Sequence, residues 1–275
     1  MTDVAVVILN YNTFQMTLDT ISEIRNQEYD GNVSIIVVDN KSPNESAKIL
    51  EENAHKLGYI FIESENNNGY AAGNNIGIKH SCSLKKAYTF VMNNDAKLPD
   101  KNTFEKMVRF MEKHREIGAA SPRIIGIDGK KDKPIYYKKP SMWDLTFGMI
   151  SYNRGRSLFD DERNCGVYAP RGSFMILRNS AVDEADYMDE STFLYYEEPI
   201  LAERLAKNGY KVAHLGDTHV IHAHAATIKT EVQKKKGLRI LCESYRIYLS
   251  KYRHFGNLLV KCCLIIRYLA ASRRS

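Results

Sequence analysis

Four short apolar runs, each followed by a segment with helical spacing, constrain the fold of this chain more than any other feature. The runs are rich in Val and Ile and cover residues 3–9, 33–40, 59–64 and 87–95. The helical segments that follow them cover residues 13–27, 46–57, 69–80 and 102–114. Continuous apolar runs of this length are typical of strands buried on both faces of a parallel sheet. Their alternation with helices predicts an α/β fold with right-handed crossovers.

Each apolar run ends in, or leads into, a cluster of Asn, Asp and Gly residues. The clusters read NYN at 10–12, DN at 39–40, NNNGY at 66–70 and NND at 93–95. Ligands of open α/β sheets bind beyond the carboxyl ends of the strands. The sequence therefore predicts one polar binding site built from these four clusters.

Several residues of these clusters have side chains suited to a nucleotide or a sugar. Tyr11 can stack on a base, and Asp39 can accept hydrogen bonds from a pyrimidine or from ribose hydroxyls. The glycines and asparagines of residues 66–78 allow close backbone approach and bind polar oxygens. Each also has a structural reading: Asp39 as a helix cap, Tyr11 as a core residue, and the glycine-rich segment as a turn into a helix.

Two further positions suggest a metal site. Asp95 ends the segment MNND at 92–95, and a lone carboxylate at a strand end can hold Mg²⁺ or Mn²⁺ together with phosphate oxygens. His222 and His224 lie two residues apart near the end of a predicted strand, where a neutral imidazole can complete a metal shell. A polar turn and a pair of packed histidines are the structural alternatives.

The segment YYEEPILAERLAKNGY at 195–210 predicts a helix that begins with two acids. Pro199 suits the first turn of a helix, and Glu197 and Glu198 beside it would interact favourably with the helix dipole. The functional interpretation is that one of the two carboxylates acts as a general base beside an acceptor hydroxyl.

Seven segments, in order along the chain, resemble the motifs of the family 2 glycosyltransferases. They are ILNYN, VVDNKS, NNNGYAAGNNIGI, MNND, GSFMILRNSAV, FLYYEEPILAERLAKNGY and VIHAHAAT. Within this family the chain looks most like the rhamnosyltransferase-like enzymes of bacterial surface polysaccharide synthesis. The resemblance implies a GT-A fold, with a Rossmann-like, mostly parallel mixed sheet flanked by helices. It implies a catalytic domain over 1–227, with a nucleotide-binding half (1–120) and an acceptor and catalytic half (121–227).

The resemblance also implies site residues. It assigns nucleotide and donor binding to Asn10, Tyr11, Asp39, Asn67, Gly69, Asn74, Asn93 and Asn94. It makes Asp95 the ligand of Mn²⁺ or Mg²⁺ with His222 as a neighbour, and Glu198 the catalytic base with Glu197 beside it. The implied reaction is an inverting, hexosyltransferase-type transfer from a dTDP- or UDP-linked sugar to a glycan hydroxyl.

The chain departs from the family pattern at four positions. Asn93 stands where the first acid of the D-x-D element is expected, and Glu198 stands in place of an aspartate. Ile200 replaces a common acid, and Ala225 replaces a small glycine. The loss of the first acid keeps one alternative open, namely a catalytically silent glycan- or lipid-binding subunit that scaffolds a polysaccharide assembly complex.

The C-terminal segment 228–275 has a composition of its own. It holds twelve Lys and Arg against two acids, so that the first 227 residues carry about −4 of the total charge of +6. Leu258, Cys262, Ile265 and Leu269 form a helical stripe, which predicts a basic amphipathic helical tail. Such a tail suits an anionic membrane surface and a lipid-linked acceptor, and the alternatives are packing on the catalytic domain or on a second copy in a homodimer.

Cysteine usage and the chain start favour a cytoplasmic protein on the inner face of a bacterial plasma membrane. The five cysteines include no C-x-x-C pair, and the start MTDVAVVILNYN resembles no signal peptide. No apolar run is long enough to span a bilayer.

Several other function classes fit the sequence poorly. Nicotinamide oxidoreductases and sugar-nucleotide pyrophosphorylases need a glycine-rich turn after the first strand, where this chain has NYNT. Processive synthases carry a Q-x-x-R-W motif, and the only tryptophan here is Trp143 in SMWDL. The basic tail lacks a platform of aromatic residues, so we expect no nucleic-acid partner.

Overall fold

The computed structural model describes residues 2–223 and 231–272 of the chain. A single mixed sheet runs through it in the order β3-β2-β1-β4-β9-β6-β10-β5. Its first half is parallel and contains β1 (Val4–Asn10), β2 (Val33–Asp39), β3 (Ile60–Glu63) and β4 (Tyr88–Asn93). These strands confirm the four predicted apolar runs to within about two residues at each end.

The second half of the sheet contains both strand directions. β9 (Phe174–Arg178) runs antiparallel to β4 and to β6 (Ile117–Gly126), whereas β10 (Lys211–His222) runs parallel to β6. Three short strands complete the sheet: β5 (Ala96–Lys97), β7 (Lys131–Asp132) and β8 (Cys165–Val167). The predicted mixed α/β architecture is confirmed: β3, β2, β1 and β4 pair in parallel, as do β6 and β10, and β9 joins the two parallel groups in the opposite direction.

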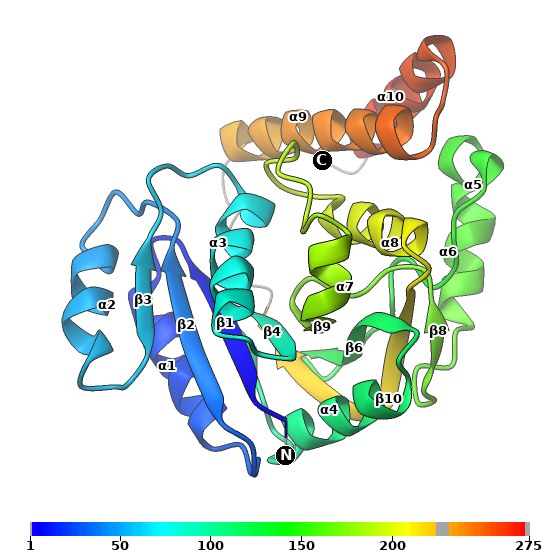
Figure 1. Cartoon of the computed structure of the whole chain (residues 1–275). Coiled ribbons are helices and arrows are strands. Elements are labelled where there is room, and N and C mark those ends of the chain that lie inside the picture. The colour runs from blue at the N-terminus through cyan, green and yellow to red at the C-terminus, as the bar shows by residue number, and fades with distance from the viewer. Residues whose placement is uncertain (1, 224–230, 273–275) are drawn as a thin grey trace.

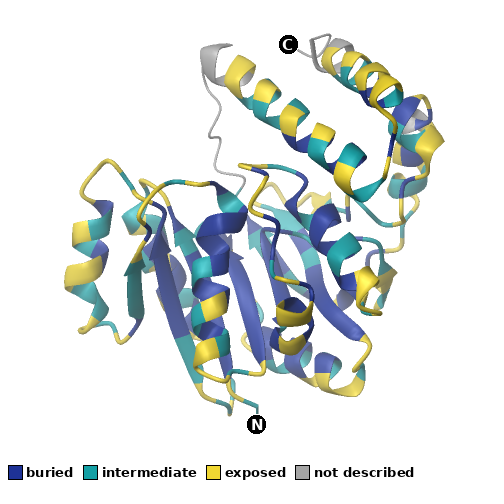
Figure 2. Cartoon of the chain, turned by 45° about the horizontal axis from the view of Figure 1, so that its top comes forward, coloured by how far each residue is buried: buried dark blue, intermediate teal, exposed yellow. Residues whose placement is uncertain are grey.

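Helices cover both faces of the sheet (Figure 1). α1 (Phe14–Arg25), α2 (Ser46–Ala54) and α4 (Thr103–Lys113) pack on one face around Phe90, Phe104 and Phe174. α3 (Tyr70–Ser83), α7 (Asn179–Glu184) and α8 (Glu197–Lys207) cover the other face. The strands are largely buried, while the outer sides of the helices are exposed (Figure 2). Burial on both faces explains why the strand sequences are continuous apolar runs.

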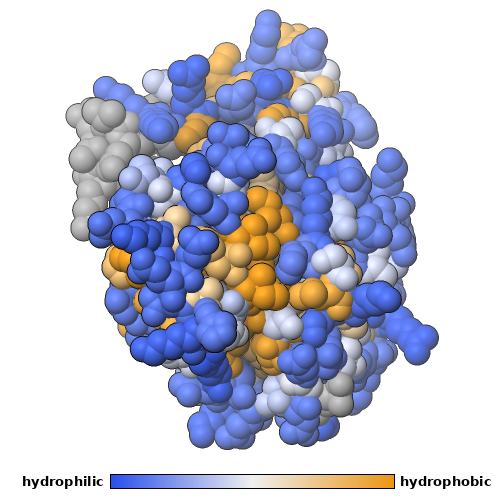
Figure 3. Space-filling view, turned by 60° about the vertical axis from the view of Figure 1, so that its left-hand side comes forward, coloured by the Kyte–Doolittle hydropathy of each residue, from blue (hydrophilic) through white to orange (hydrophobic). Residues whose placement is uncertain are grey.

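The face on the β3 side of the sheet is less completely covered. Figure 3 shows a strip of apolar surface there, bordered by hydrophilic side chains. The buried cluster of β1 and β2 on the α3 side, which includes Val7 and Ile36, is closed by Ile60, Ile62 and Ile76, which are only partly buried. On this face, Ile76 of α3 packs against the same cluster as Ile60 and Ile62 of the edge strand β3.

Residues 121–170 are more regular than the sequence suggested. We expected a loop-rich connection, but β6 continues to Gly126, and α5 (Met142–Thr146) and α6 (Met149–Ser157) follow. The two helices have the sequences MWDLT and MISYNRGRS, which are too short and too polar to show a long apolar period, so the pattern gave no signal for them.

The C-terminal segment is helical, as predicted. α9 (Glu231–Ile247) passes through a π-helical turn, η1 (Tyr248–Tyr252), and α10 (Asn257–Ser272) folds back across it. Their shared core contains Tyr245, Tyr248 and Val260 and extends to Tyr196 and Ile200 at the start of α8. In the described part of the chain, no helix combines the length and the apolar character that crossing a membrane requires. The division at residue 227 stays a prediction.

Candidate active site

Asn10 and Asp39 end the neighbouring strands β1 and β2 and hold each other in place. The Asn10 amide donates to Asp39 at 2.7 Å, and both Ser42 groups, the hydroxyl and the backbone N–H, donate to the same carboxylate at 2.7 and 2.8 Å. Asn10 and Asp39 are fully buried. The Asp39 carboxylate therefore fixes the two loops that follow β1 and β2. Tyr11, which follows Asn10 in the first of these loops, is 45% exposed.

Asn94 connects this pair to the end of β4. Its amide donates to the hydroxyls of Thr13 and Thr17 at 2.7 and 3.0 Å, and Thr17 in turn donates to Asn10 at 2.8 Å. The polar clusters after β1, β2 and β4 thus form one hydrogen-bonded layer. The structure brings Asn10, Asp39 and Asn94 together, as expected from their strand ends.

The glycine-rich turn before α3 approaches another part of the backbone very closely. Gly69 has a φ of 98°, and a Cβ added there would lie 2.1 Å from the carbonyl oxygen of Phe193. The next residue, Tyr70, donates its backbone N–H to that same oxygen at 2.9 Å. Asn67 caps the turn by accepting from the Asn40 amide at 3.0 Å and from the Gly69 N–H at 3.2 Å. Only glycine fits this position.

Two neighbouring asparagines of α3 have different roles. Asn74 is buried and donates to the Tyr70 carbonyl at 2.9 Å within its own helix. Asn75 instead holds the segment that leads to α8: it donates to the Met188 carbonyl and to Glu190, both at 2.8 Å, and accepts from the Met188 N–H at 3.1 Å. Asn75 was missed because the sequence offered no means to separate it from its neighbour.

Asp95, His222 and Asn93 form the candidate metal site. The His222 Nε2 lies 2.9 Å from a carboxylate oxygen of Asp95 and 3.3 Å from the Asn93 amide nitrogen. The Asp95 and His222 side chains are both only 10% exposed. Ala223 also donates its N–H to the Asp95 carbonyl at 3.2 Å, which fixes the end of β10 against the end of β4. His224 and Ala225 lie outside the described residues.

This donor set fits a hard divalent cation that also binds phosphate. A carboxylate oxygen, an imidazole nitrogen and an amide lie together here, and the 2.9 Å between His222 and Asp95 is the distance of a hydrogen bond or ion pair. Among the described residues, no three His, Cys, Asp or Glu side chains gather into a complete metal site. Mg²⁺ and Mn²⁺ tolerate this because a substrate diphosphate supplies further ligands.

Glu197 and Glu198 begin α8, as predicted, but their environments differ. Glu197 is 5% exposed, and burial, followed by the charge of Glu198, raises its pKa to about 8. Glu198 is only partly buried, and one of its carboxylate oxygens accepts the Gly172 N–H at 3.2 Å. At neutral pH the first carboxyl is mostly protonated, which leaves Glu198 as the accessible carboxylate.

Tyr70 lies between the glutamate pair and the metal site. Its hydroxyl donates to the Gly172 carbonyl at 2.6 Å and lies 3.4 Å from the Asn93 side-chain oxygen. Burial, followed by the charges of Glu198 and Glu197, raises the pKa of Tyr70 well above its ordinary value. The hydroxyl thus keeps its proton and links the loop under Glu198 to the end of β4. The sequence placed Tyr70 only within a glycine-rich turn.

The chain is similar in sequence to known glycosyltransferases. The model of a family described as glycosyl transferase family 2 matches residues 5–185. The chain is 25% identical over 222 residues to a low-salt glycan biosynthesis hexosyltransferase, Agl10, from Haloferax volcanii, which covers 80% of this chain and 67% of that protein.

Solved structures of similar fold are glycosyltransferases as well. A mannosyltransferase from Pyrobaculum calidifontis, in complex with GDP-Man and Mn²⁺, aligns with a TM-score of 0.65 at 14% identity, over 99% of this chain and 75% of that one. GalNAc-T7 with UDP, GalNAc and Mn²⁺ aligns with a TM-score of 0.63 at 14% identity, over 95% and 54%. TarS from S. aureus with UDP-GlcNAc gives 0.58 at 15% identity, over 98% and 73%. These neighbours confirm the GT-A fold.

Proposed function

Because this chain belongs to glycosyl transferase family 2, we propose that it is an inverting, metal-dependent hexosyltransferase acting on a nucleotide-sugar donor. One observation carries the proposal: the partly buried Glu198 and the candidate metal ligands Asp95 and His222 lie on either side of Tyr70 and the Gly172 loop. A base for the acceptor and a site for the leaving diphosphate are the two parts that a single displacement needs.

In this reaction Glu198 removes the proton from an acceptor hydroxyl as that oxygen attacks the anomeric carbon. The bond from that carbon to the diphosphate breaks on the opposite face, so the configuration inverts. Glu197, protonated in its buried position, keeps a second negative charge away from the base. The Gly172 N–H orients the Glu198 carboxylate by its hydrogen bond at 3.2 Å.

Asp95 and His222 would hold Mn²⁺ or Mg²⁺, and Asn93 would contribute a neutral amide beside them. A divalent cation at this position would neutralise the charge that develops on the diphosphate. The buried layer of Asn10, Asp39 and Asn94 would shape the nucleotide site, and Tyr11 would stack on the base at its mouth. Asn67, Gly69 and Asn74 would line the donor pocket.

For the donor we propose dTDP-rhamnose or a UDP-hexose. The acceptor is a glycan, carried on a lipid, in bacterial cell-surface polysaccharide synthesis. Support for a glycan acceptor comes from the Haloferax relative, which is a hexosyltransferase of low-salt glycan biosynthesis. Support for a nucleoside-diphosphate donor comes from the GDP-Man, UDP and UDP-GlcNAc bound by the structural neighbours.

The outer face of α10 supports a peripheral position on the inner face of an anionic plasma membrane. Leu258, Ile265 and Tyr268 are 78%, 60% and 57% exposed along one side of this helix, and Lys261 lies among them. Hence Leu258, Cys262 and Ile265 of the predicted stripe face outward, whereas Val260 and Cys263 pack inward. Exposed apolar residues next to cations suit an anionic lipid interface.

This membrane assignment is tested by sedimentation of the full chain with phosphatidylglycerol-containing vesicles at low salt. Ile265→Asp places a charge in the apolar stripe and should abolish co-sedimentation. Ile127→Asp makes the same change at a 72% exposed residue elsewhere and should leave it intact. Equal sedimentation of both variants would contradict a lipid contact through α10.

The enzymatic proposal is tested by incubating the protein with Mn²⁺, a panel of nucleotide sugars and a lipid-linked glycan acceptor. Proton NMR of the product should show the anomeric configuration opposite to that of the donor, and Glu198→Gln should remove turnover. A product with retained configuration would exclude single displacement. Absence of donor turnover throughout the panel would favour the catalytically silent scaffold.

A further inference from the structure

We propose that α9 and η1 position Glu197 and Glu198, and that they do so through their contacts with the ring of Tyr196. This inference rests on the proposed role of Glu198 as the base. It gives the C-terminal helices a part in turnover that is separate from any membrane contact.

The backbone immediately before the glutamates is in a conformation that needs outside support. Tyr195 and Tyr196 have φ values of 75° and 68°, in the left-handed region that non-glycine residues rarely adopt. Such a conformation is unfavourable for a residue with a side chain and persists only where surrounding contacts hold it. Glu197 follows directly, so the direction in which α8 starts depends on these two residues.

The C-terminal helices supply that support through stacked rings. The Tyr196 ring lies 5.1 Å from the Tyr245 ring at 18° and 5.3 Å from the Tyr248 ring at 26°. All three rings are almost completely buried. Tyr245 is itself fixed by a hydrogen bond of 2.7 Å from its hydroxyl to the Leu145 carbonyl. Any rotation of the Tyr195–Tyr196 backbone would have to break this stack.

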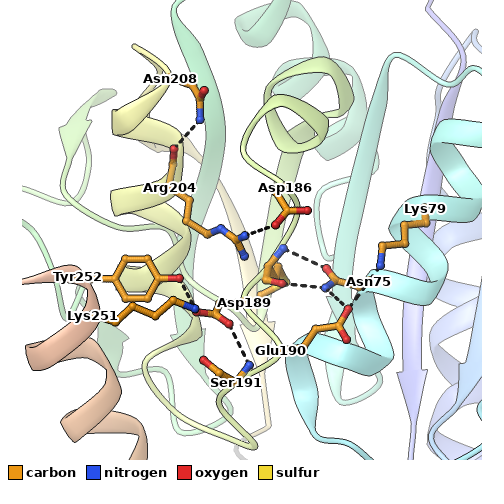
Figure 4. A network of polar contacts seen from close by, with 11 residues as sticks. Asn75, Lys79, Asp186, Asp189, Glu190, Ser191, Arg204, Asn208, Lys251 and Tyr252 are labelled. Carbon is orange, nitrogen blue, oxygen red and sulfur yellow. Dashed lines mark hydrogen bonds and ion pairs between the residues drawn. The ribbon is translucent and has the colours of Figure 1, made fainter.

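Two polar contacts hold the preceding segment to the same helices. The Ser244 hydroxyl donates to the Leu194 carbonyl at 2.8 Å. Asp189 accepts from Lys251 at 2.7 Å and also from the Tyr252 hydroxyl, while its other oxygen accepts the Ser191 N–H at 2.9 Å (Figure 4). These contacts depress the pKa of Asp189 far below its ordinary value despite its burial, so it stays charged at neutral pH.

On its other side, the same segment is held by the donor half of the site. Asn75 of α3 binds both polar groups of the Met188 backbone, and Phe193 accepts the Tyr70 N–H. The segment 188–196 therefore lies between α3 and η1 and is anchored to both (Figure 4). The α3 contacts set its distance from the donor pocket, and the tyrosine stack sets the direction of the glutamates.

The test compares three variants of the full chain. Tyr196→Leu removes the stack, Tyr196→Phe keeps its ring, and Tyr59→Leu makes the same change at a similarly buried tyrosine between α2 and β3. Tyr196→Leu should lower kcat about 10- to 100-fold, because displacement of a catalytic group by about 1 Å has effects of this size. The donor KM should change less than about twofold, since Tyr196 does not reach the nucleotide layer. Tyr196→Phe should restore kcat, and Tyr59→Leu should leave it unchanged.

Hydrogen–deuterium exchange provides a second readout that needs no catalysis. Amides of residues 188–200 should exchange faster in Tyr196→Leu than in the wild type or in Tyr59→Leu. An unchanged kcat together with unchanged exchange in a folded Tyr196→Leu protein would overturn the proposal, as would equal losses in Tyr196→Phe. If the wild type lacks transferase activity, the proposed function fails, and faster exchange would still establish the support of this segment by the stack.

Discussion

The two sides of the site are built in different ways. On the nucleotide side, the neighbouring strands β2, β1 and β4 of the sheet end side by side. Asn10 binds Asp39 there, and Thr17 links Asn94 to Asn10. On the glutamate side, Glu197 and Glu198 depend on a strained turn that is held by α9, almost fifty residues later in the sequence. The positions of the residues on the nucleotide side follow from the order of strands in the sheet, whereas the positions of the glutamates depend on tertiary packing.

The two sides also differ in how their charges are stabilised. The Asp39 carboxylate is fully buried but accepts three hydrogen bonds. The Glu197 carboxyl is almost as buried, and its Oε1 has no hydrogen-bond partner among the described residues. Burial, followed by the charge of Glu198, holds this carboxyl in its neutral form by raising its pKa. Changes on the nucleotide side should therefore affect binding, and changes on the glutamate side should affect turnover and its pH dependence.

The largest expected effect is a loss of turnover with no loss of nucleotide affinity. Glu198→Gln removes the base but keeps the size of the side chain, so kcat should fall about 10²- to 10⁴-fold. The dissociation constant for a nucleoside diphosphate should stay the same, which calorimetric titration would measure. A comparable loss of nucleotide affinity would break the proposed division of labour.

Gly69→Ala should disturb both sides of the site, because Gly69 lies against the backbone of Phe193, in the segment that leads to the glutamates. A Cβ there meets the Phe193 carbonyl carbon at 2.7 Å as well as its oxygen, and the φ of 98° is unfavourable for alanine. We expect a loss of at least about 2 kcal/mol in the free energy of unfolding, measured with urea. Gly129→Ala is the control, since its φ is also positive but its added Cβ meets nothing within 4 Å. Equal destabilisation of both variants would show that the close approach to Phe193 is unimportant.

Asp39→Asn should weaken the nucleotide side alone. An amide at this position turns a donor toward the Asn10 amide or toward the Ser42 N–H, which leaves a buried group unsatisfied. The free energy of unfolding should fall by about 1–3 kcal/mol, and the donor KM should rise while kcat changes little. Initial rates over a range of donor concentrations would measure both constants, and a fall in kcat with an unchanged KM would contradict this expectation.

One substitution on the glutamate side, Glu197→Gln, should raise the free energy of unfolding. With its pKa raised from 4.5 to about 8, Glu197 keeps its proton in the folded protein over a range in which the unfolded chain loses it. The wild type therefore loses stability as pH rises from about 4.5 to about 8. Glu197→Gln has no proton to lose and should be more stable by up to about 4 kcal/mol at pH 8 and by nearly nothing at pH 4.5. Urea unfolding at the two pH values measures the difference, and a gain independent of pH would show that burial of the charge is not its cause.

The sequence predicts one of these sides much better than the other. Buried parallel strands are continuous apolar runs, and their ends meet at one edge, so the polar clusters after β1, β2 and β4 could be assigned to one site without a structure. The start of α8 was also predicted, because acids and a proline mark a helix N-terminus.

Other features could not be predicted because they depend on contacts distant in sequence. Tyr70 links the Gly172 loop to β4, and Tyr196 meets α9, but a tyrosine in either segment has no local pattern that distinguishes it from a core residue. The outward direction of the α10 stripe could not be predicted either. The periodicity showed an apolar face, but only packing decides whether that face is covered.

Calorimetric titration of nucleoside diphosphates with and without Mn²⁺ tests the central claim most directly. We expect the wild type and Glu198→Gln to bind one nucleoside diphosphate with equal affinity, and only when the metal is present. Asp95→Ala should not bind it. Metal-independent binding that survives Asp95→Ala would contradict the assignment of the diphosphate to this edge of the sheet.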